Sequence, residues 1–301
     1  RLSETKGRMM SRVIRYSMTV AIVALYVVSS WAYPRGRVQI QNGTVVTDQG
    51  TLLRAVDYFV DKQNQTKNNF TQNPVSWKKI KGYGFNCVRL SVLFDHRYPP
   101  QYSVDESIPF TDQAVQNAED AGLYICIDYH DCGGYTKSHM VDWWTKAAPR
   151  YADKTHVIYE LANEPVAWKA NDYRDHHLND FEEVYGIIRQ HAPETHVILL
   201  SFAGADQAMV PVADKLDGID WSNASVGFHP YHTCSSRHIK DLKAKYPCVA
   251  TEFILPTGGN THQLMCKMDG EAWMVKSLED LGISWMIWYN GMYDGKFDMI
   301  S

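Results

Sequence analysis

The feature that most constrains the fold is a repeated alternation of short apolar runs with stretches of helical composition. Eight runs rich in β-branched and other apolar residues recur along the chain, at Leu53–Phe59, Cys87–Leu93, Tyr124–His130, Val157–Glu164, His196–Ala203, Ser225–Tyr231, Cys248–Leu255 and Ile283–Asn290. Helical stretches separate several of them, for example Thr111–Ala121, Asp172–His191 and Glu271–Leu281. Nearly continuous apolar strands that alternate with helices are typical of a parallel sheet covered by helices. Eight such units predict an α/β fold, a closed (β/α)8 TIM barrel.

The alternative to a closed barrel is an open, doubly wound sheet, which usually has a glycine-rich phosphate loop after its first strand. Here the first run is followed by Val60–Asn64, which contains no glycine, so the closed barrel is favoured. Thr111-Asp112 and Asp172 are expected to cap helix N-termini. Gly122 and Gly282 stand where helices should end, just before a strand.

Residues 1–32 have the composition of an export signal. Arg8, Arg12 and Arg15 form a positive region before the uncharged apolar run Met18–Val28, and Ser30-Trp31-Ala32 provides small residues of the kind that a signal peptidase recognises. The run is shorter than the ~20 apolar residues that span a bilayer, so a cleaved signal peptide is favoured over an uncleaved membrane anchor. We therefore expect a secreted, extracellular protein whose main domain covers residues 33–301.

The segments before the first predicted strand and after the last one differ in length. Tyr33–Gly50 is expected to lead into the first strand as a loop or a small hairpin. The eighth run ends at Asn290, and only residues 291–301 follow it. A full eighth helix needs about ten residues plus a loop. The sequence therefore leaves room for a barrel that lacks its last helix, in a domain truncated at its C-terminus.

Charge and ligand spacing argue against nucleic-acid and metal partners. The formal net charge is −4, whereas a nucleic-acid partner requires a basic face. His229 and His232 are three residues apart, but no carboxylate or cysteine accompanies them at ligand spacing, so we predict no zinc site. The Gly-x-Ser-x-Gly motif of serine hydrolases is absent.

The six cysteines are even in number, which permits disulfides in an exported protein. Three of them lie within apolar runs and are expected to be buried thiols: Cys87, Cys126 and Cys248. Three others lie in loops and are better candidates for disulfides, whose pairing stays open: Cys132, Cys234 and Cys266. Four N-glycosylation sequons also fit export and predict a glycoprotein: Asn42, Asn64, Asn69 and Asn223.

Polar side chains gather where the predicted strands end. They are Arg89 on the second run, His130 on the third, Asn163 and Glu164 on the fourth, His229 and Tyr231 on the sixth, Glu252 on the seventh and Trp288 on the eighth. In a (β/α)8 barrel the active site lies at the carboxyl ends of the strands. A charge inside an apolar strand is costly unless it is paired, so these glutamates require a partner or a function.

Two carboxylates that face each other across a cleft are what the hydrolysis of a glycosidic bond requires. Glu164 and Glu252 lie on the fourth and seventh predicted strands, nearly opposite each other in a ring of eight. This placement is compatible with the separation of roughly 5 Å that retaining glycosidases have. The alternative for either glutamate alone is a buried ion pair with Arg89. Taken together, the two carboxylates predict a retaining β-glycosidase.

Six segments in chain order strengthen this interpretation. They are Gly84–Leu90, Ile127–His130, Val157–Pro165 with its Asn-Glu-Pro triplet, His229–Tyr231, Thr251–Phe253 and Trp288. These segments resemble the strand motifs of glycoside hydrolase family 5, the cellulase family of clan A. The resemblance runs from about Leu53 to Asn290 and implies the same barrel, so residues 33–301 would form its catalytic domain.

The resemblance implies a role for each matched residue. Glu164 would be the acid/base and Glu252 the nucleophile. Arg89 and Tyr231 would hydrogen-bond Glu252 and keep it ionised, whereas Glu164 must keep its proton at rest. The remaining matched residues would bind the sugar. Asn163 would contact the 2-hydroxyl, His130 and His229 would contact other hydroxyls, and Trp288 would lie beneath the attacked ring.

One motif departs from the family, which often has Arg-Gly-x-Asn at the end of strand one where this chain has Arg54–Asp57. The resemblance implies a monomer that hydrolyses β-1,4-linked polysaccharide without a cofactor or metal, and without membrane contact after signal removal. An endo-β-1,4-glucanase is the first expectation. A β-mannanase or another β-glycanase with the same machinery, and a non-catalytic glycan-binding barrel, are the alternatives.

Overall fold

The computed structural model describes residues 36–60, 71–94, 102–166, 169–231, 233–254, 267–268 and 272–288. The chain divides into two units, Arg1–Pro34 and Arg35–Ser301, and every described residue belongs to the second. The predicted signal peptide and residues 291–301, on which the question of the last helix depends, lie outside the described residues. His232 and Cys266 do as well.

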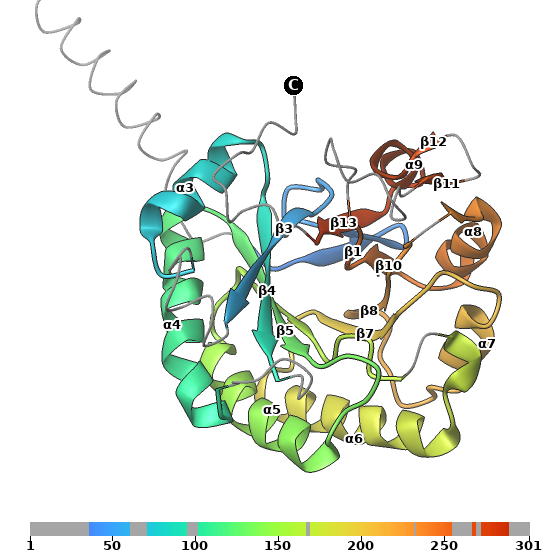
Figure 1. Ribbon diagram of the computed structural model, residues 1–301, viewed down its shortest axis with the longest axis horizontal. Coiled ribbons are helices and arrows are strands. Elements are labelled where there is room, and N and C mark those ends of the chain that lie inside the picture. The colour runs from blue at the N-terminus through green and yellow to red at the C-terminus, as the bar shows by residue number, and fades with distance from the viewer. Residues whose placement is uncertain are drawn as a thin grey trace, which may run out of the picture. The chain divides into compact units, whose positions relative to one another are not determined.

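Eight parallel strands close into a barrel, which confirms the predicted (β/α)8 architecture (Figure 1). In chain order they are β3 (Arg54–Val60), β4 (Cys87–Leu93), β5 (Tyr124–His130), β6 (Val157–Glu160), β7 (Val197–Phe202), β8 (Ala224–Phe228), β10 (Cys248–Ala250) and β13 (Ser284–Ile287). The barrel closes where β13 pairs with β3, with Met286 opposite Ala55. Each of the eight apolar runs therefore contributes one strand.

Several strands end earlier than the apolar runs that predict them. The run Val157–Glu164 forms a strand only as far as Glu160, and the run Cys248–Leu255 only as far as Ala250. The chain leaves the sheet beyond these points, and Glu164 has a backbone φ of 38°, in the left-handed region. Apolar composition continues past the last ladder hydrogen bond because the rim of the barrel is also buried.

Helices pack around the outside of the barrel (Figure 1). They are α3 (Pro74–Gly82), α4 (Val104–Ala121), α5 (Lys137–Tyr151), η1 (Ala170–Asp172), α6 (Asp175–His191), α7 (Met209–Ala213), α8 (Ser236–Lys245) and α9 (Met274–Asp280). A small sheet of three short strands joins β9 (Thr233–Cys234), β11 (Lys267–Met268) and β12 (Ala272–Trp273). Within the described part of the chain, none of the helices is long and apolar enough to cross a membrane.

Two of the predicted N-caps are wrong. Helix α4 begins at Val104 instead of Thr111, because Ser103 and Glu106 form a capping box there and satisfy each other's backbone N–H groups. Asp172 ends the short helix η1, and α6 begins at Asp175. Gly122 is confirmed as the C-cap of α4, with the left-handed φ of 75° that glycine adopts without steric cost.

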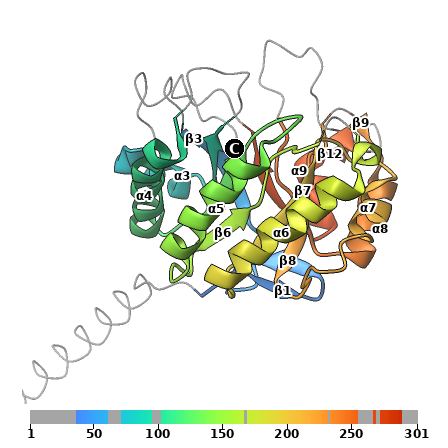
Figure 2. The same ribbon diagram turned by 90° about the horizontal axis from the view of Figure 1, so that it is seen from below.

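A hairpin at the amino end of the strands confirms the expectation for Tyr33–Gly50. It pairs β1 (Gln39–Gln41) with β2 (Thr44–Val46) and lies against one end of the barrel (Figure 2). Ser284 joins it to the barrel, donating to the Val45 carbonyl at 2.6 Å and accepting from the Leu53 N–H at 2.8 Å. The buried apolar residues at this end, called here the barrel floor, are Val38, Val45, Leu53, Ala55, Cys87, Tyr124, Cys126, Ile158, Ile198, Val249 and Met286.

Candidate active site

The barrel brings all eight predicted site residues to the opposite end from the floor. Their positions are Arg89 within β4, His130 at the end of β5, Asn163 and Glu164 after β6, His229 and Tyr231 after β8, Glu252 after β10, and Trp288 after β13. Tyr231 and Trp288 are partly exposed, and the other six are buried. The site is therefore a mostly buried polar cluster that is partly exposed at Tyr231 and Trp288.

Glu252 lies among hydrogen-bond donors. Arg89 donates from Nη1 to Glu252 Oε2 at 3.0 Å, and the Tyr231 hydroxyl donates to Oε1. The carboxylate is 6% exposed, so little water competes with these donors. A cation and a phenol stabilise the ionised form, which a nucleophile requires.

Glu164 has a different environment, dominated by His229. The two side chains approach at 2.7 Å between His229 Nδ1 and Glu164 Oε1, and His229 Nε2 lies 3.1 Å from the Thr251 hydroxyl. Burial opposes charge on the imidazole, but the carboxylates of Glu252 and Glu164 outweigh it and raise the pKa of His229. Both ring nitrogens thus face acceptors, as suits an imidazolium.

The same pair bears on the expected protonation of Glu164. Burial favours the neutral form of Glu164, but the hydrogen bond and charge of His229 outweigh it and hold the pKa of Glu164 well below its usual value. The thiol of Cys132 adds a hydrogen bond to Glu164 Oε2 at 3.0 Å, which also favours the carboxylate. The contact with His229 therefore favours the ionised carboxylate of Glu164, whereas the expected acid role requires Glu164 to carry a proton.

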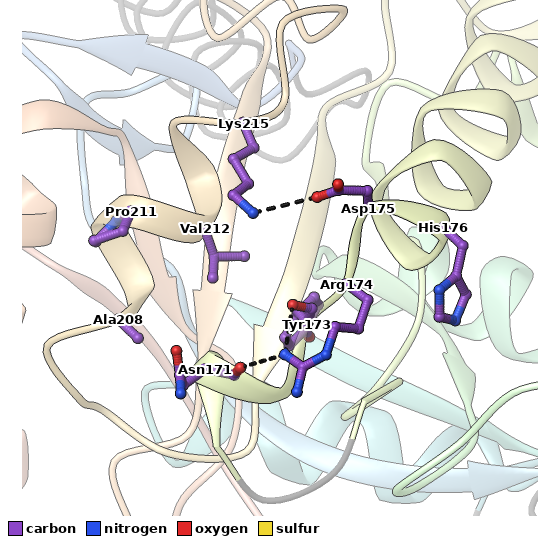
Figure 3. A pocket seen from close by; sticks show the side chains of 9 residues that line it. All are labelled: Asn171, Tyr173, Arg174, Asp175, His176, Ala208, Pro211, Val212 and Lys215. Atoms are coloured by element: carbon purple, nitrogen blue, oxygen red, sulfur yellow. Dashed lines mark hydrogen bonds and ion pairs between the residues drawn. The ribbon is translucent and has the colours of Figure 1, made fainter.

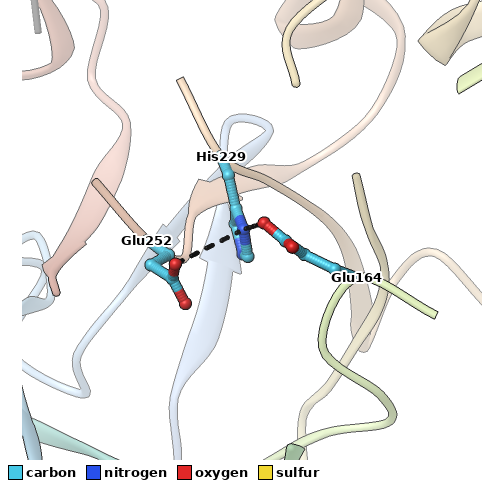
Figure 4. Close-up of side chains that lie close together, drawn as sticks. All are labelled: Glu164, His229 and Glu252. Carbon is cyan, nitrogen blue, oxygen red and sulfur yellow. Dashed lines mark hydrogen bonds and ion pairs between the residues drawn. The ribbon is translucent and has the colours of Figure 1, made fainter. Parts of the chain in front are cut away.

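The two glutamates face each other across His229 (Figure 4). One oxygen from each carboxylate and a ring nitrogen of His229 all lie within 4.8 Å of one another. This spacing matches the roughly 5 Å between carboxyl groups that double displacement requires, and it is too short for the intervening water of an inverting enzyme.

These three residues are also the group, within the described ranges, whose ligand atoms could converge on a metal ion. Their arrangement has an explanation without one, because the Nδ1 of His229 is already hydrogen-bonded to Glu164. The proximity of two carboxylates and an imidazole is what acid/base chemistry on a sugar needs.

Arg89 is the centre of a buried network that the sequence predicted only in part. Its guanidinium is fully buried and forms a bidentate pair with Glu160, at 2.6 and 2.9 Å. It also lies 3.3 Å from Asp57 and 2.9 Å from Asp128. Finally it donates to the side-chain oxygen of Asn163 at 2.8 Å. One arginine therefore orients both Glu252 and the amide of Asn163, the residue before Glu164.

Three of these carboxylates were missed from the sequence: Asp57, Asp128 and Glu160. All three are charges inside apolar runs, and the rule that such charges need partners applied to them as much as to the strand ends. The alternation of side chains along each strand decides which of these carboxylates face the barrel interior. Strand β7 provides a further hydrogen-bond donor to one of them, Glu160. Its bulge between Leu199 and Phe202 aims Ser201 Oγ at Glu160, at 2.6 Å.

Burial reduces the negative charge of this network. Desolvation raises the pKa of Asp57 well above its usual value, although Arg89 opposes the shift. Desolvation likewise raises the pKa of Asp128 to about 6. A raised pKa favours the protonated form of Asp57, and a protonated carboxyl has one donor and one acceptor, as an asparagine side chain does.

His130 is held in one tautomer beside the mouth of the site. Its Nδ1 lies 2.6 Å from the Asp128 carboxylate, and its Nε2 lies 3.4 Å from the Asn163 amide nitrogen. Burial, aided by the charge of Arg89, lowers the pKa of His130 to about 4, so the ring is neutral with its proton on Nδ1. The Trp288 ring stacks on His130 with centroids 5.2 Å apart and an interplanar angle of 16°.

Two cavities lie outside the pair of glutamates, and one of them is lined by Pro165, the residue that follows Glu164. One of about 510 Å³ is formed by the loop after β5 and the segment from β6 to α6, and it is lined by Gly133, Gly134, Tyr135, Lys137, Pro165, Val166, Asp172, His176, His177 and Asp180. A second, of about 610 Å³, lies between that segment and α7, where Lys215 pairs with Asp175 at 3.2 Å (Figure 3). Both are lined by His176, and neither is lined by Glu164 or Glu252.

An eight-stranded barrel with paired glutamates at the carboxyl ends of its strands has the architecture of a glycoside hydrolase. Residues 58–294 match the cellulase family, glycosyl hydrolase family 5, and the chain belongs to that family.

Curated relatives agree with this assignment. Endoglucanase E-5 of Thermobifida fusca is 29% identical over 178 residues, which are 52% of this chain and 36% of that protein. Endoglucanase A of Evansella cellulosilytica is 32% identical over 129 residues, which are 40% of this chain and 24% of that protein. The chain thus matches well under half the length of each of these relatives.

Solved structures share the fold. The catalytic domain of Thermobifida fusca endoglucanase Cel5A superposes with a TM-score of 0.62 at 20% identity, over 84% of each chain. A β-mannanase from Thermomonospora fusca, solved with mannotriose, superposes with a TM-score of 0.62 at 18% identity, over 86% of this chain and 87% of that one. Both likenesses show that this chain shares the (β/α)8 barrel fold of these structures.

Proposed function

We propose that this protein is a secreted, retaining endo-β-1,4-glucanase with Glu252 as nucleophile and Glu164 as acid/base. The observation that supports this most is the approach of the two carboxylates to within 4.8 Å in unequal environments. Donors surround Glu252, whereas Glu164 shares a proton with His229. Unequal environments are how two carboxylates divide the roles of nucleophile and acid.

The reaction follows from these contacts. Glu252 attacks the anomeric carbon while the departing glycosidic oxygen takes a proton from Glu164. His229 supplies that proton over the 2.7 Å to Glu164 Oε1 as the developing negative charge of the leaving group draws it across. Glu164 then removes a proton from the water that displaces Glu252, and the configuration of the sugar is retained.

Cellulose-type β-glucan is the proposed substrate. Both curated relatives described above are named endoglucanases, and a variant of the Thermobifida fusca catalytic domain has been solved in complex with cellotetraose. The β-mannanase likeness keeps β-mannan as the second candidate.

The decisive experiment changes each glutamate in turn and varies the leaving group. Glu252→Gln should lower kcat on every β-glycoside by roughly 10³-fold or more, because the nucleophile is lost. Glu164→Gln should lower kcat/KM by roughly 10²- to 10⁴-fold on cello-oligosaccharides, and far less on 2,4-dinitrophenyl β-cellobioside, whose leaving group needs no proton. The exposed Glu183→Gln is the matched control and should retain full activity.

Product analysis then separates the remaining possibilities. The first product seen by NMR should be the β-anomer, and an initial α-anomer would overturn the retaining mechanism. A rapid fall in the viscosity of carboxymethylcellulose supports endo cleavage of glucan, whereas turnover of mannan alone would move the assignment to a mannanase. Secretion is tested by expressing the full chain and sequencing the exported protein, whose N-terminus should follow Ala32.

A further inference from the structure

The loop after β5 is joined to the Asn163-Glu164 segment at three consecutive residues. The Asp131 carbonyl accepts from the Asn163 amide at 2.8 Å. The Cys132 thiol donates to Glu164 Oε2 at 3.0 Å, and the Gly133 N–H donates to the Glu164 carbonyl at 2.7 Å. The strands β5 and β6 are neighbours in the barrel. These three hydrogen bonds thus connect the loops that follow the two strands, at the position of the candidate acid/base.

The backbone of Glu164 explains why such a connection is needed. Its φ of 38° lies in the left-handed region, which a non-glycine residue adopts only at a cost in free energy. A residue keeps such a conformation only where its surroundings hold it. The Gly133 N–H holds the main-chain oxygen of Glu164, and the Cys132 thiol holds the end of its side chain.

Cys132 also completes the hydrogen bonding of the carboxylate. His229 holds Oε1 and Cys132 holds Oε2, so neither oxygen can rotate away without losing a donor. A thiol is a weak donor, and it orients the carboxylate while removing less of its basicity than a hydroxyl or an amide would. This is what an acid that must accept and release a proton in each catalytic cycle needs.

We propose that Cys132 is a positioning residue for the acid/base: its thiol fixes the carboxylate of Glu164 in the orientation that delivers a proton to the leaving group. The inference rests on the proposed role of Glu164. Cys132 acts through that carboxylate, and its effect should therefore depend on how much protonation the leaving group needs.

The test measures kcat/KM of Cys132→Ala and Cys132→Ser on two substrates, cellotetraose and 2,4-dinitrophenyl β-cellobioside. Cys132→Ala should lose roughly threefold to tenfold on cellotetraose, the size of one hydrogen bond, and less than twofold on the dinitrophenyl substrate. Cys132→Ser keeps a donor at this position and should recover most of the loss. Cys87→Ala removes a thiol from the barrel floor and should change neither substrate selectively.

Equal losses on both substrates would overturn the proposal, because they would indicate a merely structural role for Cys132. Glu164→Gln, measured in parallel, tests the proposed function separately. If it lacks the strong dependence on leaving group, the role of Glu164 fails. If it shows that dependence and Cys132→Ala does not, only the role of Cys132 fails.

A second measurement avoids any dependence on how the variants fold. Methyl methanethiosulfonate converts the thiol of the wild-type protein into a methyl disulfide and releases methanesulfinate, which removes the S–H donor. With capping at Cys132 verified by peptide mass spectrometry, activity on cellotetraose should fall, and dithiothreitol should restore it. Full activity of the capped enzyme would contradict the proposal, and Cys132→Ser should not respond to the reagent.

Discussion

The two ends of the barrel interior are built from the same eight strands and hold opposite kinds of side chains. The floor packs apolar residues such as Leu53 and Ile198 beneath the β1–β2 hairpin. The other end buries Arg89 among four carboxylates. The floor stabilises the fold through apolar burial, whereas the upper layers give up some of that stabilisation to hold charges in fixed geometry.

The comparison also shows what each end can tolerate. A buried apolar layer loses free energy in proportion to the volume removed, and its neighbours relax partly into the space. In a buried charged network the loss of free energy does not scale with the volume removed, because removing one partner leaves another charge without compensation. Changes at the two ends should therefore separate stability from activity.

The largest effect is expected from Arg89→Met, which removes the shared cation of the upper network. Its loss leaves Glu160 and Glu252 without their main partner, so unfolding free energy should fall by about 3–5 kcal/mol and hydrolysis should be abolished. Chemical denaturation and assays on cellotetraose test both parts. A variant that kept most of its activity would show that Glu252 is oriented by Tyr231 alone.

Leu53→Ala tests the floor. The fully buried side chain should cost about 2–5 kcal/mol of stability, as large-to-small changes in apolar cores do. Activity of the folded fraction should stay near that of the wild type, because Leu53 packs at the end of the barrel away from the glutamates. Thermal melting with kcat measured well below Tm provides the check, and a parallel loss of kcat would mean that the two ends are coupled.

The smallest effect is expected from Asp57→Asn. Because burial raises the pKa of Asp57, the folded protein keeps this proton above pH ~4, where an unfolded aspartate has lost it. Stability from this group therefore falls as pH rises above ~4, and the amide removes that dependence. Chemical denaturation at pH values from 4 to 7 should show that the unfolding free energy of the variant rises relative to that of the wild type as the pH increases. If the unfolding free energy of the variant instead fell relative to that of the wild type toward neutral pH, Asp57 would be ionised beside Arg89.

Much of this could be predicted from sequence because the signals are local. Eight apolar runs predicted the strands of the barrel, and charges at their ends predicted the site. The N-cap at Ser103 was missed although its capping box with Glu106 can be recognised in the sequence. The contact between Cys132 and Glu164 could not have been found in this way, because it joins two loops whose paths follow from neither sequence segment alone.

The sequence by itself determined the periodicity of strand and helix, and with it the end of the barrel at which polar residues collect. These follow from properties of single segments, such as apolar burial and the helix stop at Gly122. Only the tertiary structure decided how charge is distributed among the groups that meet there. Contact with His229 lowers the pKa of Glu164, whereas burial raises the pKa of Asp57 even beside Arg89. The pKa of a group depends on desolvation and on neighbours that the folded chain brings within a few ångströms.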